Sequence, residues 1–435
     1  MLSRITFPGA SALRFRDFRL FWSGYLCEVS GQQMLWIAQG WLIYELSGSA
    51  LLLGVAGLAR ALPATVLTFV GGALADKVDQ RRLLIGVQLI QICLLSSLGF
   101  LAFTGVVTVW HLLVIITASA GAQSFENPAR QAIFPRLVSR EALMDAVALN
   151  SLVYPSTRFF GPFLGGLLMV SVRVATGNPL MGAAVLFFVT AFGYLMNAFF
   201  ISLLRVPPVA AERKGTSVFA DMAAGLRSVI QKPIFGWLIL MTYCVQFFGW
   251  SFQGLFPLFA KDIFGGGEFE LGVMNSALGA GSVVGAIVAS NLARVQRRGL
   301  VIIAGFFAQA TFVALFATSP VLSIGLALLL LVGLTQSVFN VALQSALQYM
   351  VPNEFRGRVM GIWGMTHTAI QPLGQLVLGA AAALLSAPIA VAGGGLAMIV
   401  IGLLLAVPNA QVRNLTLEDA ETADARRREP VRAGH

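Results

Sequence analysis

The sequence predicts an all-α membrane protein with twelve transmembrane helices in two pseudo-symmetric six-helix halves. Three observations carry this prediction: an apolar composition, basic residues confined to alternate connections, and an internal repeat. Of the 435 residues, 57% are hydrophobic and 11% are charged, whereas soluble domains have about 45–50% and about 25%. With a mean hydropathy of +0.82, most of the surface must face lipid, which excludes soluble enzymes, disordered chains and secreted disulfide scaffolds.

Twelve segments are long enough to cross a bilayer, which requires about 20 mainly apolar residues. The first is too long for the core of a signal peptide and has no cleavage site after it. Continuous apolar runs of this length favour helices over barrel strands. The predicted spans are 19–46, 50–74, 83–104, 108–128, 143–171, 179–204, 234–260, 270–293, 300–318, 321–348, 358–386 and 388–408.

Basic residues are distributed unevenly between the two sides of the predicted membrane. The two termini and every second connection hold 25 of the 29 Lys and Arg residues, whereas the opposite side holds only Arg173 and Lys261. The positive-inside rule therefore predicts a multi-pass protein of the cell (inner) membrane with both termini in the cytoplasm. The net charge of +10 then reflects this topology and attraction to anionic lipid, rather than nucleic-acid binding.

An internal repeat divides the chain into two halves. At an offset of 213 residues, Gln123-Ser124 and Asn127 align with Gln336-Ser337 and Asn340; chance similarity in apolar sequence is the alternative. Two repeats in one orientation imply halves related by an axis along the membrane normal. The predicted parts are an N-terminal half at 1–205, a cytoplasmic linker with an amphipathic helix at 206–232, a C-terminal half at 233–409 and a disordered cytoplasmic tail at 410–435.

Two motifs carry a resemblance to a known family. The connection after the second span contains Gly71–Lys77 followed by Arg81-Arg82, and the fifth span contains Gly161–Gly166 with the pattern Gly-Pro-x-x-Gly-Gly. They resemble the cytoplasmic loop motif and the exporter motif of the major facilitator superfamily, although Asp79 stands where that family commonly has glycine. The stretches Asp17–Trp22, Asn127–Pro135 and Arg356–Met360 are similar to the branch that holds the enterobactin exporter and macrolide efflux proteins.

The resemblance implies the major facilitator fold, drug:proton antiport and a role in siderophore export or multidrug resistance. It also places a cytoplasmic gate at the inner ends of the second and fourth spans, where an acid can pair with an arginine. The predicted gate residues are Gly72, Asp76, Arg81, Glu126 and Arg130. The predicted exporter-motif residues, which offer a smooth helix surface, are Gly161, Pro162, Gly165 and Gly166.

Ionisable groups within the spans predict the proton-coupling residues, because such groups are costly in lipid and mark function by default. Glu28 lies about 14 Å into the first span at 1.5 Å per residue and is the one carboxylate expected near mid-membrane. His367 lies at a similar depth in the eleventh span. We predict that Glu28 alternates between protonation and pairing with an arginine or substrate. A Glu–Arg pair that only fixes helix packing is the alternative.

Polar and aromatic residues at helical spacing predict a central cavity for an amphiphilic molecule, since few polar anchors interrupt apolar walls. Interhelical hydrogen bonding is the alternative role for each glutamine. Two embedded arginines against one carboxylate favour an anionic or zwitterionic substrate. The predicted substrate-binding residues are Gln32, Trp36, Arg60, Arg158, Gln246, Trp250, Gln336, Asn340 and Gln371.

These features predict a secondary active transporter that acts as a proton-coupled exporter of a siderophore or drug-like compound. No ATP-binding loop or catalytic triad occurs in the sequence, so an ion gradient is the expected energy source and an enzyme is not expected. No cofactor and no metal site are predicted, and the protein is expected to function as a monomer. An uptake permease or lipid flippase of the same fold, or a ligand-binding membrane sensor, remain as alternatives.

Overall fold

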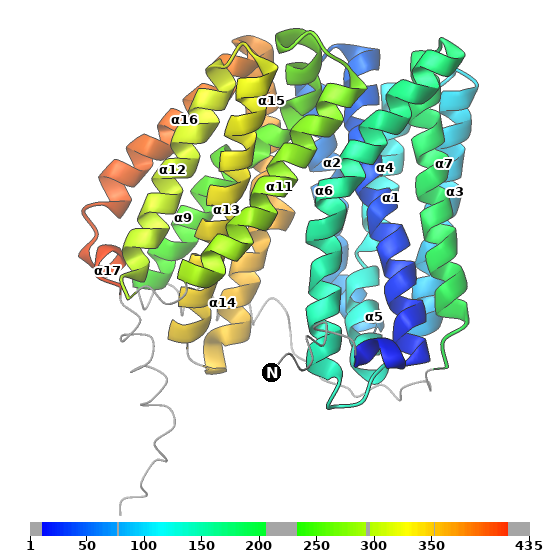
Figure 1. Cartoon of the computed structure of the whole chain (residues 1–435), viewed down its shortest axis with the longest axis horizontal. Coiled ribbons are helices and arrows are strands. Elements are labelled where there is room, and N and C mark those ends of the chain that lie inside the picture. Colours follow the sequence, from blue (N-terminus) through cyan, green and yellow to red (C-terminus); the bar gives the residue numbers. More distant parts are fainter. Residues whose placement is uncertain (1–10, 76–77, 206–232, 293–295, 352, 416–435) are drawn as a thin grey trace, which may run out of the picture. The chain divides into compact units, whose positions relative to one another are not determined.

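The computed structural model describes residues 11–75, 78–205, 233–292, 296–351 and 353–415, and within these ranges the chain forms helices and no strands (Figure 1). Nine of the described helices are long and apolar enough to cross a membrane. An all-α membrane fold is therefore confirmed, whereas the number of twelve spans stays a prediction. The predicted linker at 206–232 and most of the predicted tail lie outside the described residues.

The chain forms two compact units, each held together by its own contacts. The first contains Met1–Lys214 and Phe256–Ser276, and the second contains Gly215–Leu255 and Ala277–His435. Residues 256–276 belong to the predicted C-terminal half by sequence, yet they pack with the N-terminal unit. Contacts at the ends of two N-terminal helices explain this grouping and are described below.

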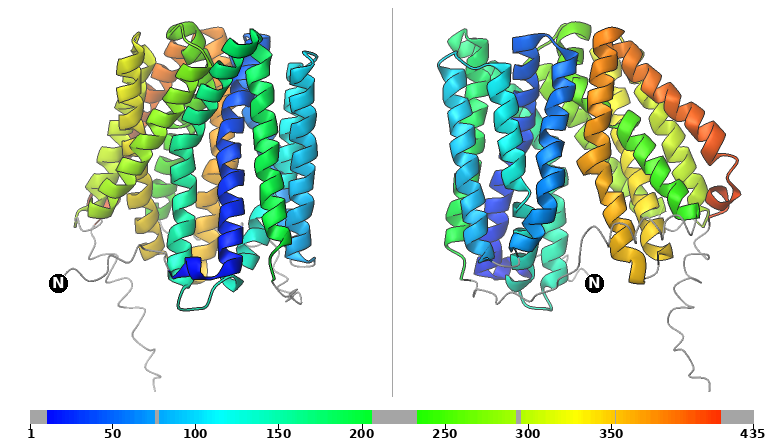
Figure 2. Two further views of the ribbon diagram at one scale, coloured as in Figure 1. Left: turned by 45° about the vertical axis from the view of Figure 1, so that its right-hand side comes forward. Right: turned by 180° about the vertical axis from the view of Figure 1, so that it is seen from behind.

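Seven helices of the first unit correspond to the first six predicted spans. Its helices α1, α3 and α7 lie side by side (Figures 1 and 2). The fourth span is broken: one helix ends at Gln123 and a short helix, α5, begins at Glu126. The bounds are α1 Arg16–Ser47, α2 Ala50–Ala75, α3 Gln80–Phe103, α4 Val109–Gln123, α5 Glu126–Ile133, α6 Leu143–Thr176 and α7 Pro179–Ser202.

The second unit contains the helices of the last six predicted spans, with breaks in three of them. Two breaks are π-helical turns, η5 (Thr366–Ile370) and η6 (Gly402–Ala406), and the third follows Gly249. The segment that returns to the first unit comprises α10 (Phe256–Leu258), the π-helical η4 (Phe259–Ile263) and the start of α11. The remaining helices are α9 Pro233–Gly249, α11 Glu268–Leu292, α12 Arg298–Thr318, α13 Leu322–Met350, α14 Asn353–Met365, α15 Gln371–Leu384, α16 Ala387–Ile401 and α17 Ala410–Arg413.

Small residues bring α1 and α7 into close contact. A Cβ atom at Gly193 would lie 2.8 Å from the carbonyl oxygen of Cys27, and one at Gly24 would lie 2.6 Å from Oδ1 of Asn197. Such a close approach requires glycine, because it lets two helix backbones pack without an intervening side chain. The polar side chain of Asn197 is thereby placed directly beside the middle of α1.

Helix α5 is fixed against α1 and α3 by a short apolar stripe. Its buried residues Glu126, Ala129, Arg130 and Ile133 share one face, since positions three and four apart are neighbours on a helix. Ala129 and Ile133 belong to a buried apolar cluster that includes Phe18 of α1 and Leu84 of α3. The same face therefore turns Glu126 and Arg130 inward.

The side chain of Asp79 explains the departure from glycine in the loop motif. It accepts hydrogen bonds from the backbone amides of Arg81 (2.9 Å) and Arg82 (3.3 Å) and so caps the N-terminus of α3. We expect Asp79→Ala to lower the free energy of unfolding by about 1 kcal/mol. The thermal unfolding midpoint in detergent measures this loss, and Asp79→Asn, which keeps the accepting oxygen, should leave the midpoint close to that of the wild type.

Candidate functional site

A buried polar cluster, the Glu28 cluster, lies between four helices of the first unit. It consists of Glu28 on α1, Gln88 on α3, Glu126 and Arg130 on α5, and Asn197 on α7. Nη2 of Arg130 donates to both carboxylate oxygens of Glu28, at 2.8 and 3.0 Å, and also forms an ion pair with Glu126. The exposed fractions are 2% for Glu28, 5% for Glu126 and 8% for Arg130. One guanidinium group thus serves two carboxylates away from solvent.

Two amide side chains complete the Glu28 cluster. Nε2 of Gln88 lies 3.2 Å from Oε2 of Glu28 and 3.4 Å from Oε1 of Glu126. Nδ2 of Asn197 also donates to Oε2 of Glu28. Both amides are buried, with exposed fractions of 0% and 1%. The two carboxylates therefore share an amide donor as well as a cation, so any change in the charge of one affects the hydrogen bonds of the other.

Aromatic residues close the Glu28 cluster on two sides. The guanidinium carbon of Arg130 lies 4.1 Å from the ring centroid of Tyr25, which is a cation–π contact. The buried hydroxyl of Tyr194 accepts hydrogen bonds from Nε2 of Gln32 (3.2 Å) and of Gln123 (3.1 Å). Gln32, a predicted substrate-binding residue, thus bonds to α7. Gln88, Asn197, Tyr25 and Tyr194 were not predicted from the sequence.

The arrangement corrects one sequence-based expectation and identifies a partner. Glu28 was expected to be the one deep carboxylate, but Glu126 shares its buried cluster. The arginine that pairs with Glu28 is Arg130, which the sequence assigned to the gate. The missed signal is the spacing of Glu126 and Arg130, four residues apart, which puts both on one helix face.

The predicted gate residues are not gathered in one place. Glu126 and Arg130 belong to the Glu28 cluster. Nε of Arg81 instead donates to the carbonyl oxygen of Ile201 at 3.1 Å, at the end of α7, where cations stabilise the helix dipole. Asp76 lies outside the described residues, and Gly72 lies on α2. The expected pairing of Asp76 with Arg130 therefore stays a prediction, and the described partners of Arg130 are acids of the cluster.

A second polar group of the first unit contains Arg60, Trp36 and Gln39. The guanidinium carbon of Arg60 lies 3.9 Å from the ring centroid of Trp36, and its Nη2 donates to Oε1 of the buried Gln39 at 2.8 Å. Trp36 is 47% exposed. Arg60 thus turns toward α1, and its planar group lies over an aromatic face, an arrangement that suits recognition of planar anions. Arg158 is half-buried on α6.

The predicted substrate-binding residues of the second unit lie on several helices. Gln246 and Trp250 are buried near the end of α9. On α13, Gln336 is buried and Asn340 half-buried, and each has a buried amide oxygen that finds no hydrogen-bond partner within the described ranges. Gln371 begins α15, and His367 lies in the π-helical turn before it. No described contact joins these residues into one site, so their shared role stays a prediction.

The exporter motif packs α6 closely against two partners. A Cβ atom at Gly161 would lie 2.7 Å from Cβ of Gln33 on α1, and Gly165 also packs on α1. A Cβ atom at Gly166 would lie 2.7 Å from the carbonyl oxygen of Glu268 and 3.0 Å from Cα of Gly272. Pro162 lies between them inside α6. The motif glycines therefore let α6 approach both α1 and the first turns of α11.

Ion pairs hold residues 256–276 to the first unit, at the opposite end of α1 from α5. Nζ of Lys261 lies 2.8 Å from Oε2 of Glu45, and Nη1 of Arg173 lies 3.0 Å from Oε2 of Glu268. Tyr44 donates to Asp262. Lys261 and Arg173 are the two cations assigned to the outer side by the charge distribution. We call these three contacts the outer-end contacts.

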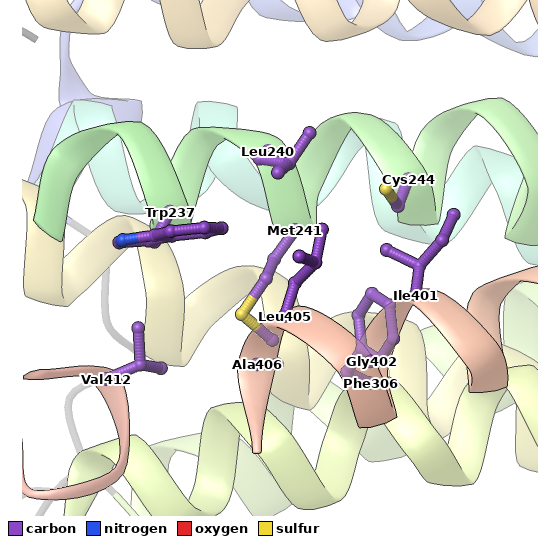
Figure 3. A pocket seen from close by; sticks show the side chains of 10 residues that line it. All are labelled: Trp237, Leu240, Met241, Cys244, Phe306, Ile401, Gly402, Leu405, Ala406 and Val412. Atoms are coloured by element: carbon purple, nitrogen blue, oxygen red, sulfur yellow. The ribbon is translucent and has the colours of Figure 1, made fainter. Parts of the chain in front are cut away.

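An apolar crevice of the second unit is lined by none of the predicted site residues. It opens between α9, α12, η6 and α17 (Figure 3), and it offers no charged group for chemistry. Its lining residues are Trp237, Leu240, Met241, Cys244, Phe306, Ile401, Gly402, Leu405, Ala406 and Val412. Among the described residues, no group of three or more His, Cys, Asp or Glu side chains could hold a metal ion.

Comparisons with solved structures show the fold. The chain is similar to a bacterial homologue of the human lysosomal transporter Spinster in an inward-facing and occupied conformation, with a TM-score of 0.69, 14% identity and coverage of 93% of this chain and 98% of that one. It is also similar to a bacterial homologue of the iron transporter ferroportin, with a TM-score of 0.69, 17% identity and coverage of 90% and 98%.

Comparisons of sequence show the family. The enterobactin exporter EntS of Salmonella choleraesuis (strain SC-B67) is 26% identical over 353 residues, which cover 79% of this chain and 80% of the exporter. Macrolide efflux protein A of Streptococcus pyogenes is 22% identical over 364 residues, 83% of this chain and 88% of that protein. The family described as "Transmembrane secretion effector" matches residues 8–433. A membrane transporter rather than an enzyme is thus confirmed, and the chain belongs to this family of the major facilitator superfamily.

Proposed function

We propose that the protein is a proton-coupled exporter of an amphiphilic small molecule, a siderophore or a drug-like compound. The observation that carries the proposal is the Glu28 cluster, a buried carboxylate–guanidinium group on α1, the first predicted span, and on α5. Buried ionisable groups in membrane helices are costly and are retained for proton or substrate pathways. Glu28 can bind a proton from one side of the membrane and lose it to the other, which links its charge to transport.

The substrate class is supported by the relatives and by the Arg60 group. The relatives named above export enterobactin and macrolides, which are organic molecules with both apolar and polar parts. The guanidinium of Arg60 lies over an exposed aromatic ring and offers a planar set of donors to carboxylate or catecholate oxygens. We therefore assign the protein to anionic or zwitterionic amphiphiles, taken from the cytoplasmic side of the inner membrane, where both termini lie.

Alternating access is supported by contacts that can break. The outer-end contacts join α1 and α6 to residues 256–276 through side chains, two of which, Arg173 and Lys261, are each 40% exposed. The partly exposed ion pair of Lys261 with Glu45 contributes only about 0–1 kcal/mol, and the Arg173 end of its pair with the buried Glu268 is open to solvent. A closure made of such contacts can therefore open and reform within a transport cycle, because a small bias between two states is enough to change their populations.

The test is export in proteoliposomes with and without an imposed pH gradient. We expect the gradient to accelerate transport of a catecholate siderophore or a macrolide by the wild type. Glu28→Gln should fold, because Arg130 keeps its ion pair with Glu126, but should lose the acceleration entirely. Glu141→Gln, which changes an exposed acid outside the helices, is the matched control and should behave as the wild type.

The same assay separates the alternatives. Transport in the inward direction alone would favour an uptake permease, and movement of labelled phospholipid alone would favour a flippase. Binding without transport would favour a sensor. Gradient-accelerated export by Glu28→Gln at the wild-type rate would overturn the role of Glu28.

A further inference from the structure

The Glu28 cluster contains more negative than positive charge. Glu28 and Glu126 each carry a carboxylate, and among the described residues the ion pairs of both are with the single guanidinium of Arg130. The helices packed around the cluster contribute neutral groups, the amides of Gln88 and Asn197. With both acids ionised, these groups leave one buried negative charge uncompensated.

Among the residues that the structure describes, the remaining titratable neighbours do not supply a positive charge. Tyr25 of α1 and Tyr194 of α7 interact electrostatically with Glu28 and Arg130, and both are neutral phenols at ordinary pH. An uncompensated buried charge costs several kcal/mol in a medium of low dielectric. One proton bound to either carboxylate removes that cost, since the other carboxylate keeps the ion pair with Arg130.

The geometry places both carboxylates around the same two donors, Arg130 and Gln88, whereas Asn197 donates to Glu28 alone. Both contact the same Nη2 atom of Arg130, and Nε2 of Gln88 lies between them, 3.2 Å from Glu28 and 3.4 Å from Glu126. A proton bound to one carboxylate therefore changes the hydrogen bonds and the ion pair of the other. The proton-binding unit is therefore larger than one residue.

We propose that Glu28 and Glu126 together hold the transported proton, as one shared site bridged by Arg130. A carboxylate oxygen of the pair takes a proton from water on one side of the membrane and becomes a neutral O–H group. Its release to water on the other side restores the second negative charge. This assignment rests on the proposed proton-coupled function and adds Glu126 as a second proton-coupling residue.

Loss of the proton also affects the contact between α1 and α5. Glu28 lies on α1, whereas Glu126 and Arg130 both lie on α5, so the ion pair of Arg130 with Glu28 ties the two helices together. A second ionised carboxylate repels the first and draws water or a cationic group of the substrate into the cluster. Proton release and substrate entry are thereby linked at one place.

The decisive experiment measures the proton directly in the purified protein, without transport. Infrared difference spectroscopy detects the C=O band of a protonated carboxyl group as the pH is raised. We expect the wild type to have one such band from the cluster. Glu126→Gln should lose the band, because the remaining Glu28 pairs with Arg130 in a neutral unit, and Glu28→Gln should lose it for the same reason. Glu141→Gln should retain it.

A band that persists in Glu126→Gln but disappears in Glu28→Gln would overturn the shared site, as would the absence of the band from the wild type. Should Glu126→Gln not fold, persistence of the band in Glu28→Gln overturns the proposal equally. Transport measured on the same preparations distinguishes the shared proton site from the proposed proton-coupled export. A wild type with the band but without gradient-accelerated export refutes the proposed function and leaves the shared site standing.

Discussion

Arg130→Met is expected to abolish gradient-driven export and to lower the free energy of unfolding by about 3–5 kcal/mol, the cost of breaking a buried ion pair by removing one partner. Two carboxylates, 2% and 5% exposed, would then share a site without the cation that serves both. Thermal unfolding in detergent measures the loss of stability, and the proteoliposome assay measures transport.

Two further variants test whether the effect of Arg130→Met comes from the unpaired buried carboxylates rather than from the loss of any arginine near α5. Arg140→Met removes an exposed arginine from the connection that follows α5 and should change neither quantity. Adding Glu28→Gln and Glu126→Gln to Arg130→Met removes the unpaired charges, so this triple variant should regain most of the lost stability while staying inactive. An Arg130→Met protein as stable as Arg140→Met would contradict the buried bridge.

The sequence predicted the fold class because membrane helices depend on composition and length, which local sequence displays. The predicted fifth span, 143–171, begins where α6 begins at Leu143. The charge distribution assigns Lys261 and Arg173 to one side, and both take part in the outer-end contacts. The pairing of residues 256–276 with the first unit was not predicted, because it depends on contacts between segments more than 90 residues apart in sequence, such as Gly166 with Gly272.

The candidate site was predicted only in part, for a similar physical reason. The depth of Glu28 in a predicted span is a local property, and it is the reason why the sequence singled out this residue of the cluster. The partners of Glu28 come from α3, α5 and α7, and their convergence depends on the glycine-lined approach of α7 and the break after α4. Gln88 and Asn197 carry no charge, so nothing in the sequence distinguished them from glutamines and asparagines that join helices elsewhere.

Gly166→Leu is expected to abolish transport and to lower stability by about 1–3 kcal/mol, the usual cost of adding bulk to a packed site. The atoms that a side chain would meet are backbone atoms, the carbonyl oxygen of Glu268 and Cα of Gly272, which cannot turn aside as a side chain can. Helix α6 must therefore move away from α11, and the nearby ion pair of Arg173 with Glu268 must lengthen or break. The matched control is Gly86→Leu, since a Cβ atom at Gly86 would meet nothing within 4 Å.

The expected separation at the outer end can be measured with a cysteine probe. Ser276 is 5% exposed and lies one turn beyond Gly272 on α11, so Ser276→Cys reports whether water enters between α6 and α11. In a background in which Cys27, Cys93 and Cys244 are replaced by alanine, a membrane-impermeant maleimide added from outside should label this cysteine faster in Gly166→Leu than in Gly86→Leu. Equal labelling in the two variants, together with unimpaired export by Gly166→Leu, would mean that the exporter motif does not maintain the outer contact. Faster labelling together with loss of export would indicate that the exporter motif is needed to close the outer end. The close approach of α11 to Gly166 would then be required for both stability and transport.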